Sequence, residues 1–321
     1  MKQRRLGRTG LMVSDIGHGL WGMGGWTGGS DEESERALDE SARLECNFFD
    51  TAWAYGQGKC DAHLGRLLKR HPDRRLIVAS KVPPKNLKWP ADPRDRYADA
   101  FPQAHVREYV GKIREALGGR EIDLLQLHVW DDGWLDDPDF AATIGALKRE
   151  GAFRWFGLSL NRWEPWNGVR AVETGLVDVV QVIYNIFDQA PEDELFPACR
   201  KADVGVIARV PLDEGSLGGA LTRASRFPES DWRSRYFAPE NLEPTMDRVE
   251  RIARDLPPGM PIVEAALRFI LGSDDVATTI VGMRTTAHVR ENLSMSDKGP
   301  LPRELHARLR AYRWDRKVRP R

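Results

Sequence analysis

The chain has 321 residues, of which 41% are hydrophobic, so it is long enough for two average domains or for one large α/β barrel. Its 48 lysines and arginines balance 48 aspartates and glutamates, and a formal net charge of +0 gives no long-range attraction for nucleic acid or for an anionic membrane surface. We therefore expect a small-molecule partner, with no nucleic acid and no membrane.

The three cysteines, Cys46, Cys60 and Cys199, are far apart and include no C-x-x-C pair. This usage indicates neither a disulfide framework nor a zinc site, and we expect no metal. The opening "MKQRRLGRTGLMVS" has no apolar core of signal-peptide length, and no stretch approaches the roughly 18 apolar residues of a membrane span. These features favour a cytoplasmic protein and leave the oligomeric state open, although a monomer would suffice.

Short apolar or β-branched segments alternate with longer amphipathic ones, which is typical of βα units around a parallel sheet. We predict strands within residues 15–21, 46–52, 75–82, 122–129, 153–160, 178–185, 204–210 and 277–283. Predicted helices between them include residues 34–45, 62–70, 104–117 and 143–151. Eight such units without a linker favour a single TIM-barrel domain over residues 1–321, although counting alone does not exclude an open doubly wound sheet.

The stretch "GHGLWG", residues 17–22, has the G-x-G-x-x-G spacing of a dinucleotide-binding turn. That motif requires a helix that begins directly at its last glycine. Here the glycine-rich "MGGWTGGSD" follows, and the first helix-capping signal is Ser30 with Asp31. We therefore interpret the segment as a barrel strand and its loop, where glycine permits close backbone approach.

Two segments, residues 83–103 and 211–244, exceed the usual length of a βα loop. Each follows the carboxyl end of a predicted strand, which is the end of a barrel where active sites are built. A further helical stretch, residues 302–318, lies beyond the eighth unit and predicts an added C-terminal helix or tail.

Three consecutive predicted strands end in ionisable residues: Asp50, Lys81 and His128. Tyr55 lies five residues past Asp50, close enough to turn back over the same rim. Each residue alone has an ordinary explanation as a helix cap, a solvated charge or a hydrogen-bonded core histidine. Because neighbouring strand ends converge in a barrel, their joint occurrence predicts one shared pocket.

These four residues predict a proton donor for carbonyl reduction. Tyrosine ionises near pH 10, so we expect the Lys81 ammonium to lower the pKa of Tyr55 and Asp50 to keep that ammonium charged. His128 would orient the substrate oxygen. No side chain supplies a hydride, so the reaction requires a nicotinamide or flavin cofactor.

The segments "FFDTAWAYG", "SKV", "LLQLH", "ALKREGAFRWFGLS", "VVQVIYN", "PLDEGSLGG" and "GMRTTAHVRENL" occur in the order and spacing of the aldo-keto reductase family, which the chain resembles over nearly its whole length. The resemblance implies a TIM barrel that binds NADPH, or less often NADH, without a Rossmann domain. It also implies that Tyr55 is the general acid, Lys81 and Asp50 lower its pKa, and His128 orients the carbonyl.

The same resemblance implies where the cofactor binds. Ser159 and Gln181 match positions that contact the nicotinamide carboxamide, but Leu160 occupies the usual asparagine position, so Asn161 is the candidate for that contact. Arg209 stands where relatives often carry an aromatic residue that stacks on the nicotinamide. Leu212, Gly215 and Leu217 match the loop that covers the pyrophosphate. Arg284 and Thr285 match positions near the adenosine 2'-phosphate, Asn292 matches an adenine contact, and Gly282 and His288 belong to the same cofactor-binding segment. His288 departs from the usual arginine or glutamine, which weakens the preference for NADPH.

Tryptophans near the ends of the first strands are the candidate substrate-pocket residues, namely Trp21, Trp26, Trp53, Trp89 and Trp130. Aromatic faces suit flat apolar carbonyls or the C–H faces of sugars. We expect reduction of an aldehyde or ketone. The alternatives are oxidation of a sugar or another alcohol by the same residues, and a non-catalytic NADPH-binding regulatory subunit.

Overall fold

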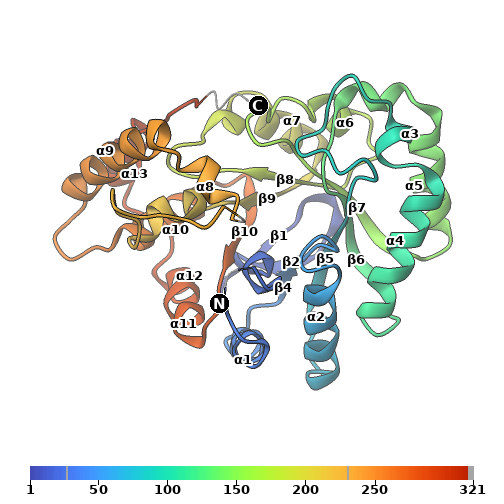
Figure 1. The fold of residues 1–321 in the computed structure, drawn as a ribbon, viewed down its shortest axis with the longest axis horizontal. Helices are drawn as coiled ribbons and strands as arrows, with labels where there is room; N and C mark the ends of the chain where they lie inside the picture. The colour runs from blue at the N-terminus through green and yellow to red at the C-terminus, as the bar shows by residue number, and fades with distance from the viewer. Residues whose placement is uncertain (27, 230, 317–321) are drawn as a thin grey trace.

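A computed structural model describes residues 1–26, 28–229 and 231–316. Its centre is a closed barrel of parallel strands in the order β10-β3-β4-β5-β6-β7-β8-β9, surrounded by helices (Figure 1). In the described residues the strands are β3 Ile16–Gly19, β4 Phe48–Asp50, β5 Ile77–Val82, β6 Ile122–Leu127, β7 Phe153–Ser159, β8 Val179–Ile183, β9 Gly205–Arg209 and β10 Val276–Gly282. Each overlaps a predicted strand, so the TIM-barrel prediction is confirmed.

Helices follow the strands and cover the outside of the barrel. Those of the described residues are α1 Asp31–Arg43, α2 Lys59–Arg70, α3 Tyr97–Ala100, α4 Gln103–Ala116, α5 Pro138–Arg149, α6 Val169–Glu173, α7 Leu195–Ala202, α8 Arg233–Tyr236, α9 Pro239–Asp255, α10 Ile262–Leu271, α11 Thr286–Leu293, α12 Met295–Lys298 and α13 Arg303–Arg310. Ser30 caps α1 as expected, because its side chain accepts from the Glu33 N–H. Helix α13 confirms the added C-terminal helix, and residues 317 and 318 of that predicted stretch lie outside the described residues.

A β-hairpin that the sequence did not predict precedes the barrel. Strands β1 (Gln3–Arg5) and β2 (Met12–Ser14) pair antiparallel, with Gln3 opposite Ser14. The side chains of Leu6, Leu11 and Val13 pack with the residues that fill the barrel interior. The hairpin therefore closes the amino-terminal end of the barrel and leaves the other end for a site.

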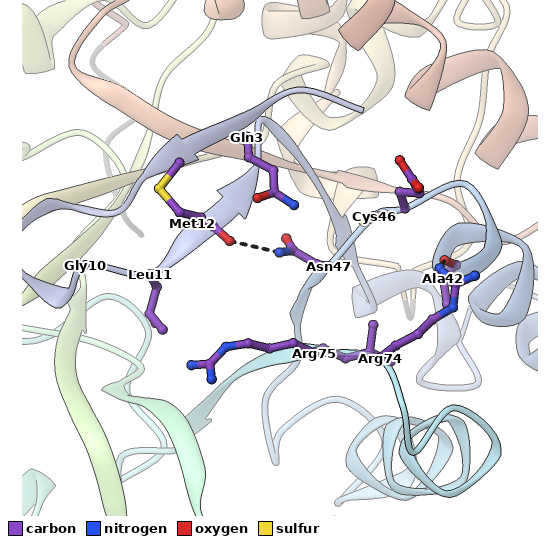
Figure 2. A pocket seen from close by; sticks show the side chains of 11 residues that line it. Gln3, Gly10, Leu11, Met12, Ala42, Cys46, Asn47, Arg74 and Arg75 are labelled. Carbon is purple, nitrogen blue, oxygen red and sulfur yellow. Dashed lines mark hydrogen bonds between the residues drawn. The ribbon is translucent and has the colours of Figure 1, made fainter.

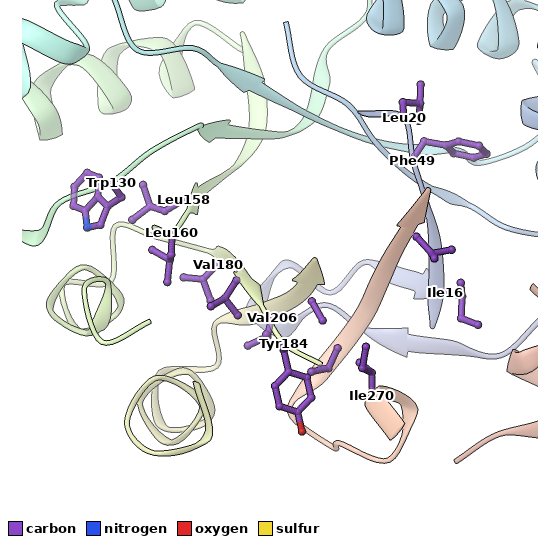
Figure 3. Packing of buried hydrophobic residues seen from close by; sticks show 14 of the residues in the cluster. Ile16, Leu20, Phe49, Trp130, Leu158, Leu160, Val180, Tyr184, Val206 and Ile270 are labelled. Carbon is purple, nitrogen blue, oxygen red and sulfur yellow. The ribbon is translucent and has the colours of Figure 1, made fainter. Parts of the chain in front are cut away.

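The barrel strands direct alternate side chains inward, and this alternation decides which polar residues enter the barrel. Phe48, Ile77 and Leu124 belong to the interior cluster. Two positions further along each of the same strands is Asp50, Ala79 or Gln126, and all three are buried. A second cluster fills the space between the strands and the helices, and part of it is drawn in Figure 3. The interior is thus apolar towards the amino-terminal end and becomes polar towards the carboxyl end.

Candidate active site

A buried ion pair lies at the carboxyl end of the barrel interior. Lys81 Nζ donates to Asp50 Oδ1 at 2.6 Å and to the Thr51 carbonyl at 2.8 Å. Both side chains are almost inaccessible, with Lys81 0% and Asp50 1% exposed. The other Asp50 oxygen accepts from Gln181 Nε2 at 2.7 Å and from Gln126 Nε2 at 3.5 Å. Hydrogen bonds from three strands therefore compensate the desolvation of this carboxylate.

Tyr55 and His128 lie next to this pair, as the sequence predicted. Lys81 Nζ is 5.3 Å from the centroid of the Tyr55 ring, and the Tyr55 and His128 rings meet edge to face with centroids 5.6 Å apart. Both rings are half-buried. The backbone N–H of His128 donates to the backbone carbonyl of Val82 at 3.1 Å, which continues the pairing of β6 with β5. The structure thus brings together all four residues predicted to form one pocket.

The protonation of these two rings follows from burial. Burial, followed by the negative charge of Asp50, raises the pKa of Tyr55 well above 10, and Arg209 opposes this shift. Burial, with Lys81 and Arg209, lowers the pKa of His128 well below 6.5. The shift of Tyr55 is opposite to the one expected from Lys81, because burial dominates it and Asp50, which pairs with Lys81 at 2.6 Å, adds a negative charge near the tyrosine. Around neutral pH the site holds a protonated tyrosine and a neutral histidine.

These shifts predict a flat pH profile. Tyr55 must be protonated to donate, and its raised pKa keeps it so up to pH 10, while His128 gains charge only well below pH 6.5. We expect kcat/KM for carbonyl reduction to stay constant within about twofold from about pH 7 to pH 9. Initial rates across that range check this prediction, and an alkaline decline with a midpoint between those values would contradict it.

Three of the predicted tryptophans lie around the rings of Tyr55 and His128. Trp21 packs on Trp26 with centroids 5.6 Å apart, and Trp26 meets Tyr55 edge to face at 6.4 Å. Trp89, from the long loop after β5, meets His128 edge to face at 4.4 Å. Trp26 and Trp89 remain 41% and 45% exposed, so apolar surface is available beside the two rings. This surface suits a flat apolar part of a substrate.

Trp53 points away from this group, which corrects its assignment to the pocket. Its ring lies against α4, where it meets Tyr109 edge to face at 5.9 Å and Lys112 Nζ at 5.8 Å. Gly58 permits this orientation, because a Cβ there would lie 2.5 Å from the Trp53 ring.

Trp130 is also corrected, because it lies in the core. It is 0% exposed, packs on Phe140 with centroids 5.0 Å apart and donates through Nε1 to Asp132 at 2.7 Å. Figure 3 shows Trp130 together with Leu158 and Leu160 in the apolar layer outside the barrel strands.

The positions expected to contact a nicotinamide carboxamide differ in their availability. Ser159 at the end of β7 pairs with Gln181 in the middle of β8, and both are buried. The Asn161 side chain already makes hydrogen bonds within the protein: its oxygen accepts from the Ala91 backbone N–H at 3.2 Å, and its amide nitrogen donates to Glu164 Oε2 at 3.0 Å. In this structure Asn161 therefore holds the long loop after β5 against the end of β7.

Arg209 ends β9 and remains a cation. Its Nη2 donates to the Leu160 carbonyl at 2.9 Å, and its Nε is buried without a hydrogen-bond partner among the described residues. Burial and the neighbouring Arg162 lower its pKa to about 10, so it stays charged at neutral pH. Arg162 itself pairs with Glu214 at 2.8 Å.

The loop after β9 has an unusual backbone. Val210, Asp213 and Glu214 have φ values of 56°, 45° and 56°, and Gly215 has a φ of 110°. Positive φ is unfavourable for residues other than glycine, above all for a β-branched valine. Strain of this kind persists only where surrounding contacts enforce it, and it is frequent at binding sites. Within this loop, the side chain of Leu212 is half-buried and that of Leu217 is fully buried.

The segment after β10 carries the remaining predicted cofactor residues. Thr285 caps α11, because its Oγ1 accepts from the His288 N–H at 3.2 Å. The His288 side chain is exposed, whereas Asn292 on the same helix is 5% exposed.

Arg284 extends over the glycine-rich segment that follows β3. A Cβ at Gly22 would lie 3.0 Å from Arg284 Cδ, and one at Gly29 would lie 4.0 Å from Arg284 Nη1. The glycines therefore make room for the arginine, which explains part of the "GHGLWGMGG" sequence in physical terms.

The cavity of Figure 2 lies at the opposite end of the barrel. It has a volume of about 560 Å³ and is formed by the β1–β2 hairpin and the segments that lead into β4 and β5. Asn47 Nδ2 crosses it to the Met12 carbonyl at 2.9 Å. None of the four predicted catalytic residues lines this cavity.

Comparison with known proteins identifies the family. The family model "Aldo/keto reductase family" matches residues 15–313. The chain belongs to the aldo-keto reductase family. It is 29% identical to the NADH-specific methylglyoxal reductase of Escherichia coli over 92% of this chain and 93% of that protein. Among solved structures, aldo-keto reductase AKR11C1 from Bacillus halodurans in its holo form has a TM-score of 0.76 at 27% identity and covers 98% of this chain and 97% of its own. Glycerol dehydrogenase AKR11B4 from Gluconobacter oxydans has a TM-score of 0.76 at 26% identity, covering 100% and 98%.

The aldo-keto reductase assignment makes this protein an NAD(P)H-dependent oxidoreductase, and the carboxyl end of the barrel fits such a cofactor. A methyl group built at Gly215, Gly218 or Gly282 would meet no atom within 4 Å, so the loops after β9 and β10 have open surface there. Arg209, whose buried Nε has no hydrogen-bond partner among the described residues, ends the strand β9 that leads into the first of these loops. These residues leave room and donor capacity for a dinucleotide.

Three further observations concern metal-ligand clusters, membrane spans and cysteines in the part of the chain that is described. Within residues 1–26, 28–229 and 231–316, no group of three or more histidine, cysteine, aspartate or glutamate side chains could hold a metal ion. No described helix is long and apolar enough to cross a membrane. The three cysteines are buried and unpaired.

Sequence reasoning missed two contributors to this aldo-keto reductase site. Gln126 bonds to Asp50, and its position two residues before His128 on the same strand was an available signal. The Arg162–Glu214 ion pair joins the segments that follow β7 and β9. The two residues are 52 positions apart, and the local sequence around either one does not predict the contact.

Proposed function

We propose that this aldo-keto reductase reduces an aldehyde or ketone to an alcohol with NADPH, and that Tyr55 is the general acid. The observation that carries the proposal is the buried Lys81–Asp50 pair, with its ammonium 5.3 Å from the Tyr55 ring and the neutral His128 beside it. A buried cation next to a buried phenol prepares the site for a negative charge on that phenol.

The four residues divide the work. The reduced nicotinamide supplies the hydride. Tyr55 donates its hydroxyl proton to the oxygen of the carbonyl as negative charge develops there, and this proton and the hydride together make the alcohol. Neutral His128 orients the carbonyl through a ring nitrogen, since a neutral imidazole has one donor and one acceptor.

Lys81 acts after the proton has left. A full charge 5.3 Å away stabilises the phenolate by about 3 kcal/mol at an effective dielectric of about 20, before the opposing charge of Asp50 is counted. Asp50 in turn keeps Lys81 protonated, because burial lowers the pKa of this lysine. Asp50 therefore has two opposing effects: it keeps Lys81 charged, and it reduces the electrostatic stabilisation that Lys81 gives to the Tyr55 phenolate.

Alcohol oxidation is the second candidate, since the solved relative from Gluconobacter oxydans is named a glycerol dehydrogenase. The same residues would serve, with the Tyr55 phenolate as base. At neutral pH the raised pKa of Tyr55 keeps it in the protonated form that donates a proton in carbonyl reduction. Rates in both directions at pH 7, with NADPH and a carbonyl or NADP⁺ and glycerol, separate the two.

The substrate class follows from the aromatic surface formed by Trp21, Trp26 and Trp89. We propose a flat apolar carbonyl, with a ketosugar as the alternative. NADPH consumption against aryl aldehydes, diketones, ketosugars and steroid-like ketones tests this assignment. Tight NADPH binding with no turnover in either direction would instead favour a non-catalytic regulatory subunit.

The preference for NADPH rests on Arg284, because a guanidinium binds a dianionic phosphate through two hydrogen bonds. The relative from Escherichia coli is named NADH-specific, so the choice needs a direct test. We expect Arg284→Ala to raise KM for NADPH roughly tenfold or more and KM for NADH less than about twofold. Arg290→Ala removes the same charge from α11 but from a side chain that pairs with Glu40, and serves as the control. Equal effects on both cofactors, or a wild type that prefers NADH, would contradict the assignment.

A further inference from the structure

The C-terminal segment after α13 lies against the loops at the carboxyl end of the barrel. The backbone N–H of Trp314 donates to the backbone carbonyl of Phe187, just beyond β8, at 2.8 Å. The rings of the two residues meet edge to face with centroids 6.0 Å apart. Arg316 follows and is only 5% exposed. Its guanidinium carbon lies 4.7 Å from the Trp314 ring centroid and 5.3 Å from that of Tyr236. The chain end thus inserts a cation among aromatic rings.

Arg316 joins two buried carboxylates from different loops. Its Nη2 donates to Asp188 Oδ2 at 2.9 Å and to Asp213 Oδ1 at 2.5 Å, and its Nη1 reaches Asp213 Oδ2 at 3.3 Å. Asp213 is 0% exposed and also accepts from Tyr236 Oη and Ser216 Oγ, each at 2.6 Å. These hydrogen bonds from Arg316, Tyr236 and Ser216 together hold the Asp213 carboxylate in one position.

Asp213 belongs to the strained loop after β9. It has a φ of 45° and lies between Val210 and Glu214, which both have a φ of 56°. Such a backbone needs contacts that enforce it. Arg316 is the cation that bonds both Asp188 and Asp213, and without it two buried carboxylates would face each other without a hydrogen-bonded counter-charge, which strongly destabilises such an arrangement.

We propose that Arg316 is a positioning residue for cofactor binding: from the C-terminal segment it fixes residues 210–217 in the conformation that receives the diphosphate of the dinucleotide. The inference rests on the proposed function in one respect, namely that this loop contacts the cofactor. Arg316 touches neither the catalytic residues nor the open surface at Gly215, and acts through Asp213. Its loss therefore changes cofactor affinity rather than the chemical step.

The test compares Arg316→Ala with the wild type by NADPH titration, followed through quenching of tryptophan fluorescence, and by kcat for 4-nitrobenzaldehyde at saturating NADPH. We expect the Kd of NADPH to rise roughly tenfold or more and kcat to stay within about threefold. Arg316→Lys, which keeps the charge but not the forked geometry, should lie between the two. Arg107→Ala breaks an exposed pair between Arg107 on α4 and Glu150, the residue directly after α5, and should change neither value.

Tyr236→Phe keeps the test decisive if Arg316→Ala fails to fold. It removes only the hydroxyl that donates to Asp213, and we expect a rise in Kd of roughly threefold or more. Unchanged affinity in whichever variants fold would overturn the proposal.

Hydrogen–deuterium exchange separates this failure from failure of the proposed function. If the wild type binds no NADPH, the proposed function is wrong. Faster exchange of residues 210–217 in Arg316→Ala without cofactor would then still support the role of Arg316 in ordering the loop, and unchanged exchange would overturn it.

Discussion

Replacement of Tyr55 by phenylalanine is expected to lower kcat for carbonyl reduction by about a thousandfold, within the range of roughly 10² to 10⁴ that a positioned general acid contributes. The change removes only the hydroxyl, so the ring contacts with His128 and Trp26 remain. We therefore expect the Kd of NADPH to change less than about twofold. Stopped-flow or steady-state rates with 4-nitrobenzaldehyde, together with fluorescence titration, measure both quantities.

Tyr109→Phe is the matched control, since Tyr109 packs on Trp53 outside the group of catalytic rings. It should leave kcat within about twofold of the wild type. If Tyr55→Phe kept kcat within tenfold of the wild type, another group would have to be the proton donor.

Replacement of Lys81 by methionine is expected to destabilise the fold by about 3 to 5 kcal/mol, because it leaves Asp50 buried without its cation. It should also abolish measurable turnover, because the Lys81 ammonium would no longer stabilise the phenolate that Tyr55 forms when it donates its proton. The free energy of unfolding from urea denaturation measures the first effect.

The double variant Asp50→Asn with Lys81→Met distinguishes charge from packing. Without the buried carboxylate, the cost of losing the ammonium should fall, so the double variant should lose less stability than the sum of the two single changes. Strict additivity, or a single-variant loss below about 1 kcal/mol, would show that the pair is not coupled as the geometry implies.

The barrel and the clustering of Asp50, Tyr55, Lys81 and His128 were predictable because both depend on regular geometry. A period of two along each strand sends Asp50 and Gln126 inward, and parallel strands bring the ends of β4, β5 and β6 to one rim. Lys81 and His128 follow the same rule. The position of a polar residue at the carboxyl end of a strand is therefore enough to predict that its side chain lies at this rim of the barrel.

The directions of loop side chains were not predictable in the same way. Trp53 and Trp130 follow strand ends as Trp21 does, yet Trp53 turns to α4 because Gly58 leaves room, and Trp130 turns into the core where Asp132 accepts its N–H. These choices depend on partners that no periodic pattern specifies.

The direction of the Tyr55 shift and the role of the chain end depend on interactions distant in sequence. The pKa of Tyr55 depends first on its burial and then on the nearby charge of Asp50, and both are set by the folded structure. Arg316 meets Asp213 across 103 residues, and a single arginine near the end of a chain gives no local sign of such a contact. The β1–β2 hairpin was missed because its strands have three residues each and are partly polar.

Deuterium transfer tests the central claim most directly. The enzyme is incubated with NADPH that carries deuterium at C4 of the reduced nicotinamide and with a panel of carbonyl compounds, and the alcohols are analysed by mass spectrometry. We expect at least one flat apolar carbonyl to yield an alcohol with deuterium on the former carbonyl carbon, and Tyr55→Phe to form this alcohol about a thousandfold more slowly. NADPH binding without deuterium in any product, and without alcohol oxidation in the reverse direction, would contradict it.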